Sequence, residues 1–310
     1  KFQKQNLLKK KALMIKSIKL SSGIEMPVLG FGTAQASRES LESAVSYAIH
    51  CGYRHFDCAW IYGNEDIVGK VLKDEMEEYG LRREDFFISS KIWYTYNTKK
   101  KIETCLNDTL KELQVDYLDL YILQWPMTFK EDVKQEPSYP FTEDIDYVAI
   151  YKILEQFVKE GKVKHLGVSN FSIEQLKDIL SFCEIKPITN QIEVHPYLQN
   201  EDVVEFCKKE GIVVSCYGSL GAGNKSKMPD MPKLLENQLL IDIGKKYHKS
   251  SAQVCLRWTV QRGLVVLPKS VTPNRILENS QIFDFELTTE EISDIRNINK
   301  KLSLYSYDLF

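Results

Sequence analysis

Short apolar runs rich in β-branched residues alternate along the chain with longer segments in which apolar residues recur at a helical period. The short runs predict eight buried strands, at residues 28–32, 55–58, 86–91, 117–123, 163–169, 188–193, 212–217 and 264–268. The longer segments predict helices, among them 40–50, 65–79, 99–113, 147–160, 173–182 and 202–210. Several of these helical segments end in a glycine just before the next strand, which is the usual signal for a helix end.

Eight strand–helix units whose strands are apolar on both faces predict an α/β protein built as a closed parallel barrel, the (β/α)8 or TIM-barrel class. A strand–turn–strand pattern at roughly residues 15–28 predicts an N-terminal β-hairpin cap. No linker interrupts the pattern, so residues 14–310 are interpreted as one domain. Residues 1–13 are interpreted as an N-terminal extension, whether native or not. A doubly wound sheet is the alternative, disfavoured because no G-x-G-x-x-G turn follows a strand.

Composition and charge exclude several classes of protein. Hydrophobic residues make up 43% and charged residues 27% of the chain, which is typical of a globular protein and not of a disordered one. The formal net charge is −2, so no overall field favours nucleic acid or an anionic membrane. No apolar run reaches the ~20 residues that span a bilayer, and the basic start lacks the pattern of a secretory signal. We therefore expect a cytoplasmic protein that binds neither nucleic acid nor membrane.

The 7 cysteines are odd in number, widely spaced and without a C-x-x-C pair. This pattern predicts reduced, mostly buried thiols rather than a disulfide framework. The chain has neither a cysteine cluster nor a histidine pair at helical ligand spacing, so no metal site is expected.

Polar residues stand at the ends of most of the predicted strands. In a parallel barrel these carboxyl ends meet on one face, and the loops beyond them form the catalytic site. The residues concerned are Asp57, Tyr62, Lys91, Gln124, Ser169, Asn170, Gln191, Tyr217, Lys269 and Ser270. Their recurrence on one face predicts a site that gathers residues from nearly the whole chain.

Several motifs carry a resemblance to a known family. They are GYRHFDCA at 52–59 with YGNE at 62–65, GVSNF at 167–171, NQIEVHP at 190–196 and LPKSVTPNRILEN at 267–279. These motifs resemble the signatures of the aldo-keto reductases, and they follow that family's order over nearly the whole chain. The resemblance implies a (β/α)8 barrel that binds NADPH across its top and reduces aldehydes and ketones.

The resemblance implies that Tyr62 is the general acid that protonates the carbonyl oxygen as hydride reaches the carbon. A free phenol titrates near ~10, so it needs a nearby cation to act as an acid near neutral pH. Lys91 can supply that cation, and Asp57 can keep the ammonium charged and oriented. Asp57 is also expected among the cofactor contacts. These residues therefore predict a proton-donating group at the top of the barrel.

Gln124 marks a departure from the family pattern. Members most often have histidine before the Trp-Pro pair, whereas this chain has Gln124 before Trp125. Glutamine offers donors and an acceptor but no positive charge, and the loss of one oxyanion donor typically costs ~10²–10³ in rate. We interpret Gln124 as the fourth catalytic residue. Reduction of a carbon–carbon double bond conjugated to a ketone is one alternative, and a non-catalytic NADPH-binding sensor or structural protein is another.

The resemblance also implies a set of NADPH contacts. The nicotinamide carboxamide and ring are expected to contact Ser169, Asn170, Gln191 and Tyr217. The adenosine 2′-phosphate is expected to be clamped by Lys269, Ser270 and Arg275. A guanidinium fork, an ammonium and a hydroxyl suit a dianion, so NADPH should be preferred over NADH. The remaining expected contacts are Thr33, Ser219, Leu220, Val271, Thr272, Glu278 and Asn279.

The substrate pocket is expected at the mouth of the barrel. Its lining is predicted to include Ala34, Tyr62, Trp93, Gln124, Trp125 and Phe129, with the C-terminal tail 305–310 over it. Relatives often carry an aromatic residue in the position of Ala34, so a wider pocket and bulkier ketones are expected. The predicted partner is a small carbonyl compound, and the protein is expected to be a monomer.

Overall fold

A ring of parallel strands forms the centre of the protein. The computed structural model describes residues 8, 11–12, 15–20, 23–93, 95–96, 98–127, 146–221 and 232–304. Eight strands pair in the order β10-β9-β8-β7-β6-β5-β4-β3, so each strand lies beside its neighbour in sequence. Their bounds are β3 Phe31–Gly32, β4 His55–Asp57, β5 Phe87–Ile92, β6 Leu118–Leu123, β7 Val163–Ser169, β8 Thr189–Glu193, β9 Val213–Tyr217 and β10 Val265–Val266.

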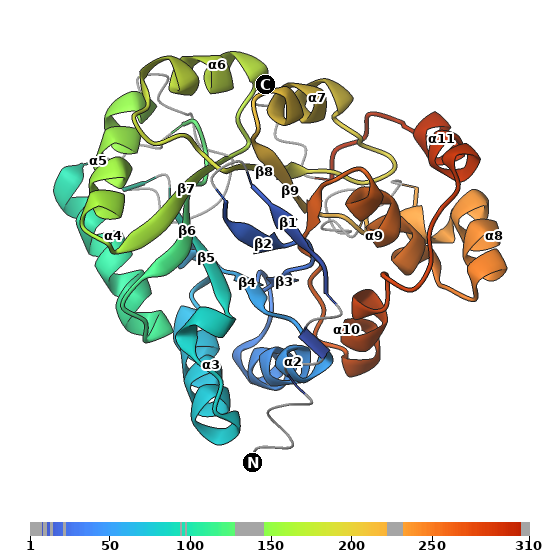
Figure 1. Ribbon diagram of the computed structural model, residues 1–310, viewed down its shortest axis with the longest axis horizontal. Helices are drawn as coiled ribbons and strands as arrows, with labels where there is room; N and C mark the ends of the chain where they lie inside the picture. Colours follow the sequence, from blue (N-terminus) through green and yellow to red (C-terminus); the bar gives the residue numbers. More distant parts are fainter. Residues whose placement is uncertain are drawn as a thin grey trace.

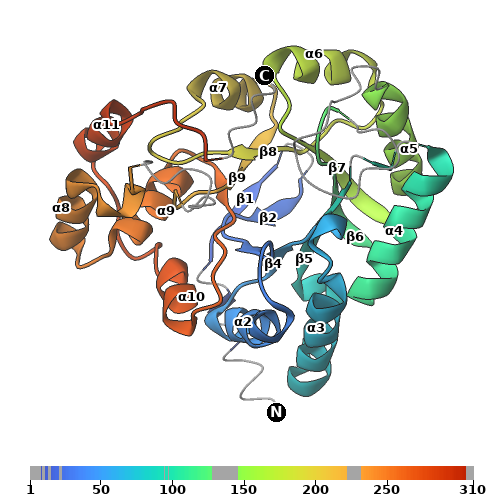
Figure 2. The same ribbon diagram turned by 180° about the vertical axis from the view of Figure 1, so that it is seen from behind.

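The ring closes between its first and last strands. Leu29 and Val266 form a parallel bridge. Around it, the amide of Gly30 donates to the carbonyl of Val266 at 2.8 Å, and the amide of Val266 donates to the carbonyl of Val28 at 2.8 Å. Both views show the strands enclosed by helices (Figure 1, Figure 2). The fold is therefore the predicted (β/α)8 barrel.

The two strands at the closure are shorter than predicted. Of the runs 28–32 and 264–268, only the residues of β3 and β10 belong to regular ladders. A side chain at Gly30 would begin 2.5 Å from a methyl group of Leu267 and 3.0 Å from the ring of His55, so these two side chains fill the space beside the glycine. The apolar pattern predicts the burial of these runs correctly, but it does not show where the pairing stops.

Helices cover the outside of the barrel. The predicted helical segments are observed as α2 Arg38–Cys51, α3 Glu65–Tyr79, α4 Lys99–Leu113, α5 Tyr147–Lys159, α6 Ile173–Phe182 and α7 Glu201–Lys209. Further helices follow at α8 Gln238–Tyr247, α9 Ser251–Gln261, α10 Pro273–Ser280 and α11 Thr289–Asn297. Their apolar faces form the main core with the outward-facing strand residues, and Phe56, Tyr121 and Trp258 are completely buried there.

An antiparallel hairpin closes one end of the barrel. It pairs β1 (Ser17–Lys19) with β2 (Glu25–Pro27), as predicted, and it lies across the middle of the ring in Figure 1. Leu20 and Met26 belong to one buried cluster with the inward-facing residue Phe87, the first residue of β5. The hairpin therefore covers the N-terminal ends of the strands, and the carboxyl ends are left for the polar residues.

Some predictions lie beyond what the structure describes. Phe129 and the tail 305–310 lie outside the described residues, so their place at the pocket stays a prediction. The interpretation of 1–13 as an extension and of 14–310 as one domain also stays a prediction. Within the described ranges, no helix has the length and apolar character needed to cross a membrane.

Candidate active site

A buried carboxylate and a buried lysine form the centre of the site. Asp57 is the last residue of β4, and its backbone pairs with Ser89 of the neighbouring strand β5. Because side chains alternate along a strand, Ser89 and Lys91 point to the same face. Lys91 Nζ lies 2.7 Å from Asp57 Oδ2 and donates to the carbonyl of Cys58 at 2.7 Å. Only 1% of Lys91 is exposed, so this ion pair is shielded from water.

Further donors hold the second carboxylate oxygen. Asp57 Oδ1 accepts from Ser89 Oγ at 2.9 Å and from Gln191 Nε2 at 3.0 Å. Gln191 belongs to β8, so this hydrogen bond connects β4 to β8 across the barrel mouth. Buried charges are tolerated when they are paired and hydrogen-bonded in this way. The arrangement keeps the charges of Asp57 and Lys91 fixed in position.

Tyr62 completes the predicted catalytic group. It ends the short helix η1 (Trp60–Tyr62) and is half-buried, and the centre of its ring lies 5.3 Å from Lys91 Nζ. Burial lowers the pKa of Lys91, but the charges of Asp57 and Tyr62 outweigh this effect, so the pKa lies above its ordinary value. The lysine is therefore a cation at neutral pH, as predicted.

The pKa of Tyr62 does not follow the simplest expectation. Lys91 lowers the pKa of the phenol, but burial raises it by more, so the pKa lies above its ordinary value. The sequence shows which cation is near the phenol, but it does not show how strongly the phenol is desolvated. Tyr62 therefore keeps its proton at neutral pH and offers a hydroxyl donor.

Hydrogen bonds through Thr33 hold the loop that carries Tyr62 in place. Gly63 takes the left-handed conformation, with φ 59°, and ends η1. Asn64 Nδ2 donates to the carbonyl of Thr33 at 2.9 Å, and Thr33 Oγ1 donates to the carbonyl of Asp57 at 2.9 Å. Thr33 is completely buried and bonds protein backbone, so its predicted cofactor contact stays a prediction.

Gln124 lies at the end of β6, as predicted, with an unusual environment. Its backbone carbonyl accepts from Asn170 Nδ2 at 3.1 Å. Its side-chain oxygen Oε1 is buried and has no hydrogen-bond partner within the described ranges. A buried unpaired polar atom costs about 1–3 kcal/mol, so this amide has unused capacity to bond a ligand.

The residues predicted to bind the nicotinamide lie together at the ends of β7, β8 and β9. Ser169 Oγ donates to the carbonyl of Gln191 at 2.8 Å, and Asn170 Nδ2 donates to Ser169 Oγ at 3.2 Å. Tyr217 OH donates to Asn170 Oδ1 at 2.8 Å. Asn170 has φ 63°, a left-handed conformation that asparagine tolerates better than most residues. The amides and hydroxyls of this group include both hydrogen-bond donors and acceptors, which suits a carboxamide.

The residues predicted to clamp a phosphate are much more open. Lys269 follows β10 and donates to the carbonyl of Gln35 at 3.0 Å, and Arg275 is exposed in the first turn of α10. Neither forms an ion pair within the described ranges, and partial burial lowers the pKa of Lys269. Ser270 Oγ accepts from the amide of Thr272 at 3.1 Å, which shapes the turn before the helix. Two cations without acidic partners provide a suitable site for an anion.

Other predicted cofactor residues have partners within the protein. Glu278 accepts a hydrogen bond from Ser250 Oγ at the start of α9. Ser219 Oγ donates to the carbonyl of Cys216 at 2.9 Å. Leu220 and Val271 are half-buried against the core, and Asn279 is buried. The predicted adenine and pyrophosphate contacts of these residues stay predictions.

The predicted pocket residues within the described ranges follow the carboxyl ends of strands. Trp93 and Trp125 are half-buried just beyond β5 and β6, and Ala34 is half-buried just after Thr33. All three therefore lie at the carboxyl ends of strands, on the same face as Tyr62. Their role in lining the substrate pocket stays a prediction.

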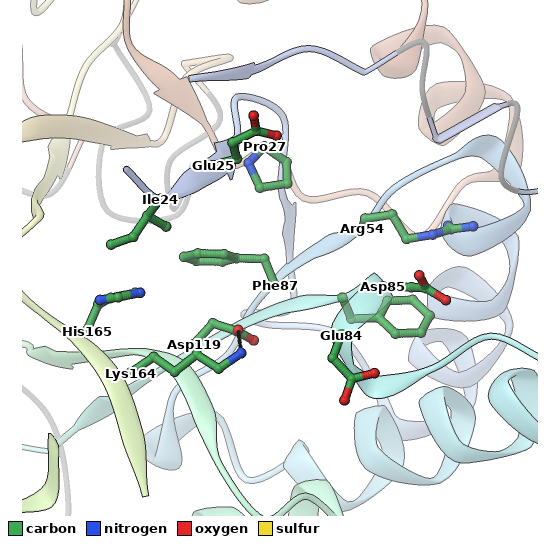
Figure 3. A pocket seen from close by; sticks show the side chains of 11 residues that line it. Ile24, Glu25, Pro27, Arg54, Glu84, Asp85, Phe87, Asp119, Lys164 and His165 are labelled. Carbon is green, nitrogen blue, oxygen red and sulfur yellow. Dashed lines mark hydrogen bonds and ion pairs between the residues drawn. The ribbon is translucent and has the colours of Figure 1, made fainter. Parts of the chain in front are cut away.

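A separate hollow of about 270 Å³ lies at the other end of the barrel (Figure 3). Its lining comes from the hairpin and from the first residues of β5, β6 and β7. Asp119 there accepts from Lys164 Nζ at 3.2 Å and from the amide of Ile88 at 2.9 Å, and it lies 2.7 Å from Arg83 Nη2. These charges satisfy one another, so this hollow is not the candidate site.

Sequence reasoning missed two groups that hold the site together. Ser89 supports Asp57, and Asn64 supports the Tyr62 loop through Thr33. The signal for Ser89 was available, because it stands two residues before Lys91 and must share its face. Asn64 lies in the YGNE motif at 62–65, but its contact with Thr33 depends on how the loop folds.

The barrel, with its buried carboxylate and lysine and the tyrosine beside them, places the protein among the reductases of this fold. The chain belongs to the aldo/keto reductase family, whose family model matches residues 28–300, and it is therefore an oxidoreductase. It is similar to aldo-keto reductase family 1 member A1 of Xenopus tropicalis, with 42% identity over 287 residues that cover 91% of this chain and 88% of that protein.

Two further comparisons agree with this placement. The Homo sapiens protein with the same printed name is 39% identical over 292 residues, covering 91% of this chain and 88% of its own. Among solved structures, the aldose reductase from Schistosoma japonicum superposes with a TM-score of 0.87 at 35% identity, covering 94% of this chain and 95% of that one.

Proposed function

We propose that this protein reduces aldehydes and ketones to alcohols with NADPH, acting as a monomer on small carbonyl compounds. The observation that carries the proposal is the buried pair of Asp57 and Lys91 beside the half-buried Tyr62 at the carboxyl ends of the strands. Family membership supports carbonyl reduction in general, and the relatives named above are reductases. When bound, NADPH supplies the hydride.

Tyr62 is the proton donor in this proposal. As hydride reaches the carbonyl carbon, negative charge develops on the oxygen, and a positioned acid must meet it. The raised pKa keeps the phenol protonated at neutral pH, and the alkoxide that forms is a far stronger base than a phenolate. Proton transfer from Tyr62 is therefore downhill. Lys91 stabilises the phenolate that remains, and Asp57 keeps Lys91 charged.

Gln124 acts as a neutral donor to the carbonyl oxygen. The donor is its Nε2 amide group. Its Oε1 has no hydrogen-bond partner in the described part of the chain and, as an acceptor, is free to bond a donor of the ligand. A glutamine does not titrate, so it adds no ionisation of its own to the pH profile of the reaction.

A preference for NADPH over NADH follows from the two cations without acidic partners. Lys269 and Arg275 lie near Ser270 at the start of α10, where a phosphate dianion can accept from an ammonium, a guanidinium and a hydroxyl. The carboxamide of the same cofactor suits the mixed donors and acceptors of Ser169, Asn170 and Gln191.

The test follows NADPH absorbance with a reactive aromatic aldehyde near neutral pH. Tyr62→Phe should reduce the rate by at least about 10²-fold, because a positioned general acid typically contributes 10²–10⁴. Tyr151→Phe is the matched control, since Tyr151 lies in α5 and its hydroxyl donates to the carbonyl of Ile185, its one hydrogen bond within the described part of the chain. That variant should keep the rate of the unmodified protein.

Three outcomes would contradict the proposal. Full activity in Tyr62→Phe would exclude this residue as the acid. Reduction of conjugated enones without reduction of aldehydes would favour the alternative chemistry at Gln124. Tight NADPH binding with no turnover of any carbonyl would favour a sensor or structural protein.

A further inference from the structure

A second buried carboxylate lies directly behind the catalytic group. Glu65 is the first residue of α3, three positions after Tyr62, and it is completely buried. Its motif is part of the family resemblance, but the reaction proposed above gives it no role. A carboxylate without exposure is costly unless its oxygens are bonded, so its contacts indicate what it does.

Both oxygens of Glu65 accept hydrogen bonds from other elements. Oε1 accepts from Ser90 Oγ of β5, and Oε2 accepts from Thr109 Oγ1 of α4 at 2.8 Å. Ser90 and Thr109 are also completely buried. One side chain therefore connects the start of α3 to a barrel strand and to the next helix.

The bond to Ser90 falls where it affects the catalytic residues. Ser89 and Lys91 point into the barrel toward Asp57, so Ser90 between them must point outward. Glu65 thus accepts a hydrogen bond from the outer face of β5, at the residue directly before Lys91. On the other side, only Gly63 and Asn64 separate Glu65 from Tyr62.

The bond to Thr109 is made possible by a close approach of α3 and α4. Gly69 lies one helical turn after Glu65 on the same face. A side chain at Gly69 would begin 2.4 Å from the carbonyl of Glu112, so the helices touch through their backbones. This contact limits how far Glu65 can move relative to α4.

The electrostatics fit a geometric role. Burial raises the pKa of Glu65 to about 7, and the hydrogen bonds from Ser90 and Thr109 oppose that rise. Burial of such a group adds little net stability compared with an apolar side chain. Its contribution is better explained by the position it gives to its neighbours.

We propose that Glu65 is a positioning residue that sets the separation of Tyr62 and Lys91, by tying the Tyr62 loop to the outer face of β5. This inference rests on the proposed function. Loss of the hydrogen bond between Glu65 and Ser90 lets the distance between the Tyr62 phenol and the Lys91 ammonium increase. A larger distance weakens both proton donation and stabilisation of the phenolate.

The experiment compares three variants in the same aldehyde assay. Glu65→Ala should lower kcat by about 10- to 100-fold, since a misplacement of ~1 Å can cost 10²-fold. Its Kd for NADPH, followed by fluorescence, should stay close to that of the unmodified protein. Glu65→Gln keeps the shape and can still bond both hydroxyls, because they can reverse their roles, so it should recover most of kcat.

Glu75→Ala is the matched control for a purely structural effect. Glu75 is a buried glutamate on the same helix, and its carboxylate bonds Ser46 and His50 of α2, away from β5. Removing it should lower the thermal midpoint as Glu65→Ala does, while kcat stays unchanged. The alkaline limb of the kcat–pH profile should move upward only in Glu65→Ala, because Lys91 lowers the pKa of Tyr62.

The outcomes separate this inference from the proposed function. An unchanged kcat and pH profile in Glu65→Ala, with Tyr62→Phe inactive, would overturn the positioning role alone. Equal loss of kcat in Glu65→Ala and Glu75→Ala would also overturn it. Absence of carbonyl reduction in the unmodified protein would overturn both. If Glu65→Ala does not fold, Ser90→Ala and Thr109→Ala each remove one bond and should each lower kcat by a smaller factor.

Discussion

The candidate site has two halves that differ in structure: a buried half around Asp57 and Lys91, and an open half around Lys269 and Arg275. Around Asp57 and Lys91 every charge is paired within the protein and nearly every polar atom is bonded. Around Lys269 and Arg275 the cations are exposed, and neither has an acidic partner in the described ranges. The first half lies within the barrel mouth, and the second lies on the turn before α10.

This difference reflects what each half has to do. Groups that move a proton must be in position before the substrate arrives, because reorganisation of these groups during the reaction raises the activation barrier of the reaction. Groups that only bind a phosphate can remain hydrated and gain a partner when the ligand arrives. The first half is therefore completed by the protein itself, and the second is completed by its ligand.

The largest expected effect comes from breaking the buried pair. Lys91→Met should abolish measurable turnover and lower the free energy of unfolding by about 3–5 kcal/mol, because it leaves Asp57 charged and buried without its cation. The same change at the open half, Lys269→Met, should alter that free energy by less than about 0.5 kcal/mol. Urea unfolding and the aldehyde assay measure both. Equal destabilisation by the two changes would contradict the contrast between the halves.

A smaller effect is expected from Arg275→Ala, which should raise the KM for NADPH while leaving kcat nearly unchanged. A hydrogen bond to a charged group contributes about 1.5–3 kcal/mol, which corresponds to a factor of about 10 to 100 in affinity. The KM for NADH should change little, because that cofactor lacks the 2′-phosphate. Steady-state kinetics with both cofactors provide the measurement. An equal rise for NADH would place Arg275 outside the phosphate site.

The smallest effect should come from salt. Exposed charges are screened at a Debye length of ~10 Å in 0.1 M salt, whereas a buried pair is screened far less. The KM for NADPH should therefore rise a few-fold as ionic strength increases, while kcat at saturating cofactor stays constant. A kcat that falls in parallel would show that the buried half is more accessible to solvent than its exposure suggests.

Much of the fold could be predicted from the sequence. The strand runs, their order and the helices between them follow from periodicity, and the barrel rule then puts Asp57, Lys91 and Gln124 on one face. The periodicity does not show how many residues of each strand pair with the neighbouring strand. At the closure, only the isolated bridge between Leu29 and Val266 and a few hydrogen bonds join the two segments, so the regular strands β3 and β10 are only two residues long.

The candidate site could be predicted in part, for a similar reason. The pairing of Asp57 with Lys91 follows from neighbouring strands, since Asp57 lies opposite Ser89 in the register and Lys91, two residues further along β5, faces the same side. The spacing of Ser89 from Lys91 indicates that the two share a face, but the hydrogen bond from Ser89 to Asp57 and the role of Glu65 depend on distances between side chains that the sequence does not give. The net direction of the Tyr62 pKa depends on the balance of burial against charge, and that balance exists only in the folded protein.

The bridge between Leu29 and Val266 has a consequence for how the chain folds during synthesis. The two residues lie near opposite ends of the sequence, so the contact has a very high sequence separation and must form late. Until residues 264–268 leave the ribosome, β3 has an unpaired edge that could join another chain. β3 is only 2 residues long, and short edge strands are poor templates for aggregation. The short strand at the closure therefore limits this risk during translation.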